Sequence, residues 1–393
     1  MSAAGERRTS EQRIREILPV VVLFAFAAAV PFFFGQLAGF IDDATIALAY
    51  VVMALGLNIV VGFAGLLDLG YVAFFAIGAY TMGWLGSTHF ANINNEEGIH
   101  VGAGGFASNL PGIHLNWLFI VLAAVVIAAI LGAVIGLPTL RLRGDYIAIV
   151  TLAFGEIIRI VALQGDELPV VPLLTDAEDY PLTGGRKGIT PVDAIDLPGF
   201  APFDPATNLR PWYLTALVLV AIVLFVNVRL RDSRLGRAWI ALREDEVAAA
   251  SMGVPLVRTK LLAYGVGAAF GGISGAFIGS FYNTVNADQF EFSFSIFILS
   301  MVILGGLGSV WGVVVGALVL SFINTYLIPD VFNTWPSKLG LDFDLTELSF
   351  GIFGFLLVIM MVLRPQGLVP ERRRKMELTE GVGTDESVYE ARA

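Results

Sequence analysis

The sequence predicts an all-α, polytopic membrane protein of about ten transmembrane helices, some of them interrupted or re-entrant, with both termini in the cytoplasm. Three observations support this prediction: the composition, the length of the apolar runs and the distribution of basic residues. Of the 393 residues, 56% are hydrophobic and 15% are charged, whereas soluble proteins contain roughly 25% charged residues. A soluble domain of this composition would expose large apolar patches, so lipid is the expected solvent.

Ten apolar runs approach the length of about 20 residues that a helix needs to cross a bilayer. The runs 292–307 and 348–363 are short, and the start of 64–85 is interrupted by glycines and by Asp68. The expected spans, in order, are 17–40, 44–62, 64–85, 116–137, 146–163, 212–228, 261–281, 292–307, 310–328 and 348–363.

The basic residues favour one orientation of these spans. With the N-terminus in the cytoplasm, 19 of the 24 basic residues lie in inner segments, four lie in outer loops and Arg159 lies within a span. This asymmetry follows the positive-inside rule and predicts that both ends are cytoplasmic. The first span also resembles a signal peptide, but its long apolar run and Pro31 favour its retention.

The spans are expected to form one transmembrane domain over 17–370. A cytoplasmic segment, 1–16, precedes it, and a charged cytoplasmic tail, 371–393, follows it and is expected to be disordered. The outer loop 164–211 is rich in Pro and acidic residues and is expected to pack as a small cap. The loop 229–260 is the long cytoplasmic connection between spans.

Several function classes are excluded by the composition. The chain has no Cys, and its three His residues, expected to be solvated in an outer loop, are not spaced like a helical metal motif. A Walker loop requires a Gly immediately before its Lys. No Lys in this sequence follows a Gly, so no ATP site is present. The net charge of −10 disfavours nucleic acid as a partner. We therefore predict no catalytic, cofactor or metal site.

Three ionisable residues are expected at membrane depth: Asp68, Glu156 and Arg159. A charge in a bilayer costs about 2.5–3.5 kcal/mol on insertion scales, so each should face the bundle. Glu156 and Arg159 are three residues apart on one helix and are expected to pair, either as a structural ion pair or as a gate or subunit contact. Asp68 either belongs to a polar path or caps the following helix.

Glycines recur every four residues on the seventh and ninth spans, where they allow close helix packing or a sliding interface. These are Gly267, Gly271, Gly275, Gly279, Gly308, Gly312 and Gly316. Two segments, 62–80 and 304–317, have a glycine-rich turn between apolar helices. They are expected to be helix breaks, which are typical of transporters. They are also expected to be copies in a parallel internal repeat.

The order of several motifs resembles one family. The motifs are GFAGLLDLGYVAFFAIGAY at 62–80, RLRGDYIAIVTLAFGEIIRI at 141–160, TGGRKGI at 183–189, SRLGRAWIALREDEVAAASMGV at 233–254 and LGGLGSVWG at 304–312. Together they resemble the M-type permease subunit of bacterial branched-chain amino acid ATP-binding-cassette (ABC) importers, over roughly 44–370. The resemblance implies a transport subunit of the inner membrane that is not itself an enzyme and forms the path for Leu, Ile and Val.

The resemblance also implies partners. These are a second related permease, two cytoplasmic ATPases and a periplasmic or lipid-anchored substrate-binding protein, with membrane lipid around the helices. By resemblance, 233–254 docks an ATPase through Arg243, Glu244, Asp245, Glu246, Ala248, Ala249 and Gly253. The alternative is an ordinary amphipathic inner loop. Good helix formers from Glu244 to Met252 predict one stiff helix there.

This chain departs from the family pattern at two places. The family pattern is Glu-Ala-Ala, three residues, then Gly. Counted back from Gly253, the glutamate position is occupied by Val247, and Glu246 lies one residue before it. In TGGRKGI, Arg186 and Lys187 replace the Pro and Asn expected in a loop that faces the binding protein.

Three alternative functions remain open at this point. Permeases of urea or short-chain amide importers are very similar in sequence. An ion-coupled secondary carrier would use Asp68 or Glu156, and a passive channel would need no energy source.

Overall fold

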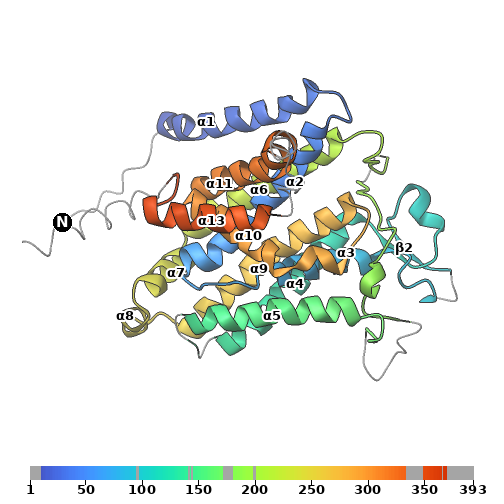
Figure 1. Ribbon diagram of the computed structural model, residues 1–393. Coiled ribbons are helices and arrows are strands. Elements are labelled where there is room, and N and C mark those ends of the chain that lie inside the picture. Colours follow the sequence, from blue (N-terminus) through green and yellow to red (C-terminus); the bar gives the residue numbers. More distant parts are fainter. Residues whose placement is uncertain are drawn as a thin grey trace, which may run out of the picture.

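The computed structural model describes residues 10–93, 97–139, 142, 145–170, 180–197, 201–332, 348–364 and 366–369. Most of these residues form helices that lie side by side (Figure 1). Residues 1–9 of the expected N-terminal segment and the expected tail 371–393 lie outside the described residues. Within the described chain, the N-terminal segment is already helical from Ser10.

Six of the described helices are long and apolar enough to cross a membrane. They are Gly39–Phe63, Trp117–Thr139, Tyr146–Gln164, Arg210–Arg231, Leu256–Phe281 and Val310–Pro329. Shorter apolar helices are Leu18–Phe32, Val72–Leu85, Phe292–Gly305 and Gly351–Leu363. Each expected span corresponds to one of these helices, so the all-α, multi-pass architecture is confirmed, while the number of crossings stays a prediction.

The helices follow one another along the chain with two π-helical extensions, η2 and η7. Their bounds are α1 (Ser10–Ala29), η1 (Val30–Phe32), α2 (Gly39–Leu57), η2 (Asn58–Phe63), α3 (Val72–Leu85), η4 (Gly105–Asn109), α4 (Trp117–Thr139), α5 (Asp145–Gln164), η5 (Gly185–Lys187), α6 (Arg210–Arg231), α7 (Arg234–Glu244), α8 (Glu246–Ser251), α9 (Leu256–Phe281), η6 (Ala287–Phe290), α10 (Phe292–Gly305), α11 (Val310–Phe322), η7 (Ile323–Phe332) and α13 (Ser349–Leu363).

Helix α9 lies at the centre and packs against α2, α3 and α4. Its glycines make this possible, because a Cβ atom at Gly275 would collide with the Phe75 carbonyl of α3. A Cβ at Gly267 would lie 3.1 Å from the Gly56 carbonyl of α2. Gly271 and Gly279 face α3 and the segment after α9 in the same way, so the backbones approach more closely than larger side chains would allow.

The second glycine series divides between a helix and a turn. Gly312 and Gly316 pack α11 against the backbone of α10 around Gly305. Gly308 lies before α11 with φ +83°, so the expectation that it lies on the ninth span was wrong. A positive φ is a conformation that glycine adopts without a Cβ penalty.

The described residues between α3 and α4 form a small sheet that the sequence does not predict. Strand β3 (Ile113–Leu115) lies between β1 (Gly86–Ser87), which is antiparallel to it, and β2 (Ile99–Val101), which is parallel. Isolated bridges join Ser87 to Val192 and Ile189 to Val285. Segments far apart in the sequence are thereby tied into one outer layer.

His114 is buried in this layer, so its expected solvation was wrong. Its Nδ1 lies 2.7 Å from Asp193 Oδ2, and its ring stacks on His100 with 5.4 Å between centroids. Burial by itself lowers the pKa of His114, but the hydrogen bond and the charge of Asp193 outweigh it and raise the pKa above its usual value. The pair therefore stabilises the fold at acidic pH, and this contribution is lost as the pH rises through the raised pKa.

The two ends of the bundle differ in character. Figure 1 places α7 and α8 at one end and β2 with its long connections at the other. The basic connection 229–260 and the small sheet thus lie at opposite ends of the bundle, which is what the predicted topology requires of them.

We predict that Gly275→Ala destabilises the bundle, because the added methyl group meets the α3 backbone, which cannot move aside like a flexible side chain. Overpacking of this kind costs about 1–3 kcal/mol. The matched control is Gly354→Ala in α13, where nothing lies within 4 Å of the added Cβ. Thermal unfolding in detergent, followed by tryptophan fluorescence, should show a lower Tm for Gly275→Ala only. Equal Tm values would contradict the close approach of α9 and α3.

Candidate functional site

The first helix break lies between η2 and α3, at residues 64–71, and its backbone is satisfied by side chains of other helices. The Leu69 N–H donates to Thr151 Oγ1 of α5 at 3.0 Å. The Val72 N–H donates to Ser295 Oγ of α10, also at 3.0 Å. Backbone groups freed by a break need such partners where no water reaches them, so the break is a built feature that connects α5 and α10.

Asp68 lies inside this break. Its side chain is 2% exposed, and its Oδ1 accepts a hydrogen bond from the Gly70 N–H at 2.9 Å. The N-cap position of α3 is Tyr71, so the interpretation of Asp68 as a helix cap was wrong, and it closes a local turn instead. Its Oδ2 is buried without a hydrogen-bond partner in the described part of the chain, which leaves Asp68 a candidate polar residue.

The second helix break, at residues 306–309, contacts η2, the helix that directly precedes the first break. Its Gly308 N–H donates to Asn58 Oδ1 at 2.9 Å, and Asn58 is the fully buried first residue of η2. A Cβ atom at Gly62 would lie 2.6 Å from the Gly308 nitrogen. The two glycine-rich motifs that the sequence predicts to be helix breaks thus pack directly on each other.

The connection 229–260 contains two helices, so the expectation of one stiff helix from Glu244 to Met252 was wrong. Asp245 is extended, with φ −155° and ψ 112°, and separates α7 from α8. Its carboxylate accepts hydrogen bonds from the N–H groups of Val247 and Ala248 at 2.8 and 3.0 Å. This N-cap favours a new helix start and interrupts a run of good helix formers.

Gly253 ends α8 in a Schellman motif. It has φ +85°, its N–H donates to the Ala250 carbonyl at 2.9 Å, and the Val254 N–H donates to the Ala249 carbonyl at 3.0 Å. This pair of bonds satisfies the last carbonyls of the helix and requires a left-handed residue at the glycine position.

Three contacts attach α7 and α8 to the membrane-spanning helices. Arg243 Nη1 donates to the Gly62 carbonyl of η2, just before the first break, at 2.7 Å. Trp239 Nε1 donates to the Thr259 carbonyl at 2.8 Å. Glu246 pairs with Lys260 at 2.7 Å, and the Lys260 side chain is 4% exposed. The connection 229–260 is therefore joined to η2, directly before the first break, by a charged side chain, Arg243, which also pairs with its neighbour Glu244 at 3.0 Å.

The free surface of α8 differs from the expected small face. Ala249 is buried at 4% exposure, so it is not available to a partner. Val247 and Met252 are 65% and 86% exposed, and Ala248 is exposed as well. An exposed apolar group of this kind, beside the exposed acids Glu244 and Asp245, is typical of an interaction surface.

The nearest partner of Arg159 is not Glu156. Arg159 Nη2 lies 3.2 Å from Glu291 Oε1, whereas its Nη1 lies 4.0 Å from Glu156 Oε2. Glu291 immediately precedes α10, and all three side chains are partly exposed. The expected pair with Glu156 is thus present at 4.0 Å, and a closer bridge joins α5 to the start of α10.

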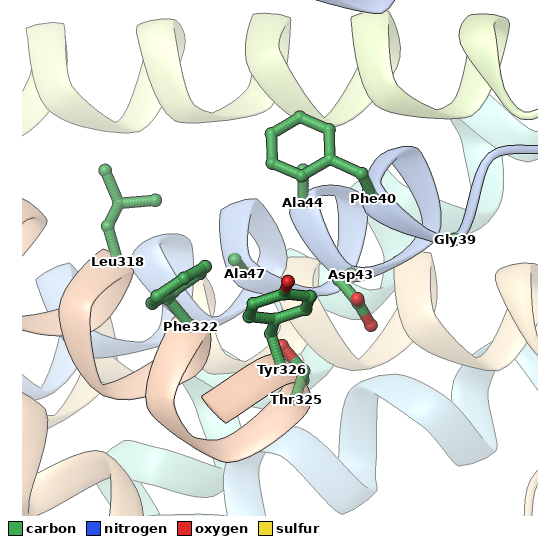
Figure 2. Close-up of a pocket in the computed structure, with 9 residues that line it drawn as sticks. All are labelled: Gly39, Phe40, Asp43, Ala44, Ala47, Leu318, Phe322, Thr325 and Tyr326. Atoms are coloured by element: carbon green, nitrogen blue, oxygen red, sulfur yellow. The ribbon is translucent and has the colours of Figure 1, made fainter. Parts of the chain in front are cut away.

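A lateral cavity of about 710 Å³ lies between α2 and the α11–η7 helix. Figure 2 shows Phe322 and Tyr326 on one side and Phe40 on the other, with Asp43 at its margin. The lining is apolar apart from Asp43, Thr325 and the Tyr326 hydroxyl. Such a lining fits acyl chains or an apolar partner surface better than a charged solute.

We predict that Arg159 is energetically coupled to Glu291 more strongly than to Glu156. In double-mutant cycles with Arg159→Gln, the Glu291→Gln cycle should give about 0.5–1 kcal/mol of coupling, the upper range for partly exposed pairs. The matched cycle with Glu156→Gln should give less, because 4.0 Å is at the limit of an ion pair. Unfolding of the detergent-solubilised protein measures both, and a larger Glu156 term would contradict the bridge to α10.

Comparison with known proteins extends these observations. The family model described as branched-chain amino acid transport system / permease component matches residues 39–361. The high-affinity branched-chain amino acid transport system permease protein LivM of Escherichia coli is 37% identical over 95% of this chain and 79% of its own length. A probable LivM of Methanocaldococcus jannaschii is 26% identical over 82% of this chain and 91% of its own length.

A second type of permease matches more weakly. The LivH permease protein of Salmonella typhimurium is 24% identical over 68% of this chain and 77% of its own length. No solved structure matches the chain. The family model covers both helix breaks and the α7–α8 connection, and with the LivM identity it confirms the resemblance of the motifs: the chain belongs to the permease component family of branched-chain amino acid transport systems.

Proposed function

We propose that this chain forms part of the path by which leucine, isoleucine and valine cross the bacterial inner membrane, as the M-type permease subunit of an ABC importer. The 37% identity to LivM of E. coli over 95% of the chain carries this proposal. The absence of a Walker lysine supports an energy source outside the chain. The subunit itself is a transport component and not an enzyme.

The proposed complex contains a second related permease, two cytoplasmic ATPases and a periplasmic or lipid-anchored substrate-binding protein. The similarity to LivH, a permease protein of a high-affinity branched-chain amino acid transport system, supports a related permease partner. The exposed apolar residues of α8 support ATPase docking at that helix. Arg243, near the end of α7 next to the docked helix, then provides the connection to η2 and the first break, through the Gly62 carbonyl.

The proposed topology has ten crossings with both termini in the cytoplasm. The transmembrane domain covers 17–370, the outer loop is 164–211, and 1–16 and 371–393 are cytoplasmic. The position of α7 and α8 at the end of the bundle opposite the small sheet supports this arrangement (Figure 1). The concentration of basic residues in the proposed inner segments supports it independently.

One observation favours a second candidate function. The buried Oδ2 of Asp68 has no hydrogen-bond partner in the described part of the chain, which is the arrangement that an ion-coupled carrier would use. A urea or short-chain amide importer would share the ABC architecture but not the amino acid substrate. Transport assays distinguish these candidates because each requires a different energy source or solute.

We predict ATP-driven uptake of leucine into proteoliposomes only when this chain is reconstituted with a second permease, ATPases and a loaded binding protein. Labelled leucine uptake is measured with ATP, without ATP and with an imposed proton or sodium gradient, and urea serves as the alternative solute. The proposal expects uptake that needs ATP and is insensitive to the gradient. Gradient-driven leucine uptake by the chain alone would support the carrier, and uptake of urea alone would support the amide importer.

We also predict that Met252 faces the cytoplasm and is covered by an ATPase. The chain has no native Cys, so Met252→Cys introduces a single thiol at a position that is 86% exposed. A membrane-impermeant thiol reagent should label Glu167→Cys, an exposed outer control, in intact cells, but Met252→Cys only after permeabilisation. Bound ATPase should then protect Met252→Cys. Labelling of Met252→Cys from outside would contradict the topology, and equal labelling with bound ATPase would contradict docking at α8.

A further inference from the structure

A second cavity, of about 400 Å³, lies where α2, α3, α9, η6 and α10 meet. It is lined by Tyr50, Phe75, Ile278, Tyr282, Asp288, Gln289, Glu291 and Phe294. In the proposed topology this is the outer half of the membrane, because η6 lies in the connection that follows the outer end of α9. The lining combines an apolar wall with a polar rim, unlike the lateral cavity of Figure 2.

The apolar wall consists of aromatic rings that hold one another in place. Phe294 lies 5.4 Å from Tyr50 and 5.3 Å from Phe75 between ring centroids. The buried Phe290 supports Phe75 from η6 at 5.8 Å. Ring pairs at these distances are favourable contacts and hold one another in place. The wall is therefore formed before any solute binds, as is usual for small-molecule sites.

The polar rim comes from three residues within four positions around η6, Asp288, Gln289 and Glu291. Glu291 is paired with Arg159 at 3.2 Å, whereas Asp288 makes no ion pair with any residue that the structure describes. The Oε1 atom of Gln289 is buried and accepts no hydrogen bond within the same residues. A buried acceptor without a donor needs an explanation, and here it lies beside an unpaired carboxylate.

An ammonium group supplies what this rim lacks. It carries a positive charge for Asp288 and three N–H donors, one of which satisfies Gln289 Oε1. An aliphatic side chain on the same solute would contact the wall of Tyr50, Phe75 and Phe294. Urea is neutral and has no aliphatic part, so it would use neither the charge nor the wall.

The rim is also tied to the outer layer. The segment before η6 is bonded to the 183–189 loop by two hydrogen bonds between Ile189 and Val285, at 2.9 and 3.0 Å. Asn286 Oδ1 accepts a hydrogen bond from the Asp288 N–H at 3.2 Å. The backbone that carries Asp288 and Gln289 is therefore held in place from two sides.

From this geometry we propose that the cavity is a solute site of the permease itself, which binds an aliphatic amino acid by its ammonium group at Asp288 and Gln289 and by its side chain at the aromatic wall. The site rests on the proposed function. It assigns to the permease a selection step after delivery by the binding protein. Asp288 and Gln289 are binding residues, and Arg159 is a positioning residue that neutralises Glu291.

The test uses the full complex with one binding protein throughout, so that differences between variants arise in the permease. Asp288→Asn removes the charge of an exposed carboxylate for the ammonium group, and uptake of leucine should fall about three- to fivefold in kcat/KM, the upper range for an exposed charge pair. The matched control, Glu167→Gln, removes an exposed outer acid away from the cavity and should keep the parent value. Gln289→Cys should be labelled by an outside thiol reagent, and saturating leucine, but not urea, should slow the labelling.

The side-chain wall is tested with Phe294→Ala and the milder Phe294→Leu. Removing the Phe294 ring enlarges the space beside the wall. This should shift the ratio of kcat/KM for leucine over valine by about threefold, close to the change expected from burying one methylene group. If the parent complex transports no branched-chain amino acid, the proposed function fails. If it transports leucine while Asp288→Asn and both Phe294 variants keep the parent rate and ratio, and leucine leaves labelling of the Gln289→Cys variant unchanged, the site is overturned and the proposed function stands.

Discussion

The structure depends on one constraint: backbone polar groups must find partners inside a bundle that is surrounded by lipid. A continuous helix meets this constraint alone, but this chain interrupts two helices at glycine-rich segments. At the breaks, side chains of four other segments supply the missing partners. These side chains are Thr151, Ser295, Asn58 and Arg243. Removing any one of them leaves a backbone group unpaired, so the breaks and their partners form one unit.

This constraint has a mechanical consequence. Because the partners come from α5, α7, α10 and η2, each break connects helices that are distant in sequence. Asn58 of η2 links the segment before the first break to the second break, and Arg243 links the same segment to α7. On the proposed function, a displacement of α8 by an ATPase reaches both breaks through two side chains. A bundle of unbroken helices would offer no comparable connection.

The sequence predicts the parts of this structure that depend on local patterns. Apolar runs identify the helices, and glycines spaced by four identify the contact face of α9, because both signals are properties of one segment. The partner of Arg159 is 132 positions away, and the helical rule i, i+3 considers only Glu156. The burial of His114 depends likewise on Asp193, and the pairing of the two breaks on Asn58. None of these contacts leaves a periodic signal.

The break at Asp245 shows how a single residue changes the interpretation of a family motif. Asp245 caps α8, so Glu246 becomes the first residue of the helix and turns inward to Lys260. The next position, where the family pattern has a glutamate, is then occupied by Val247 on the exposed side. The shift of the acid by one residue therefore exchanges an outward charge for an outward apolar group. On the proposed function, the ATPase groove that receives α8 should offer an apolar pocket to Val247 and Met252, with basic residues at its margin for Glu244 and Asp245.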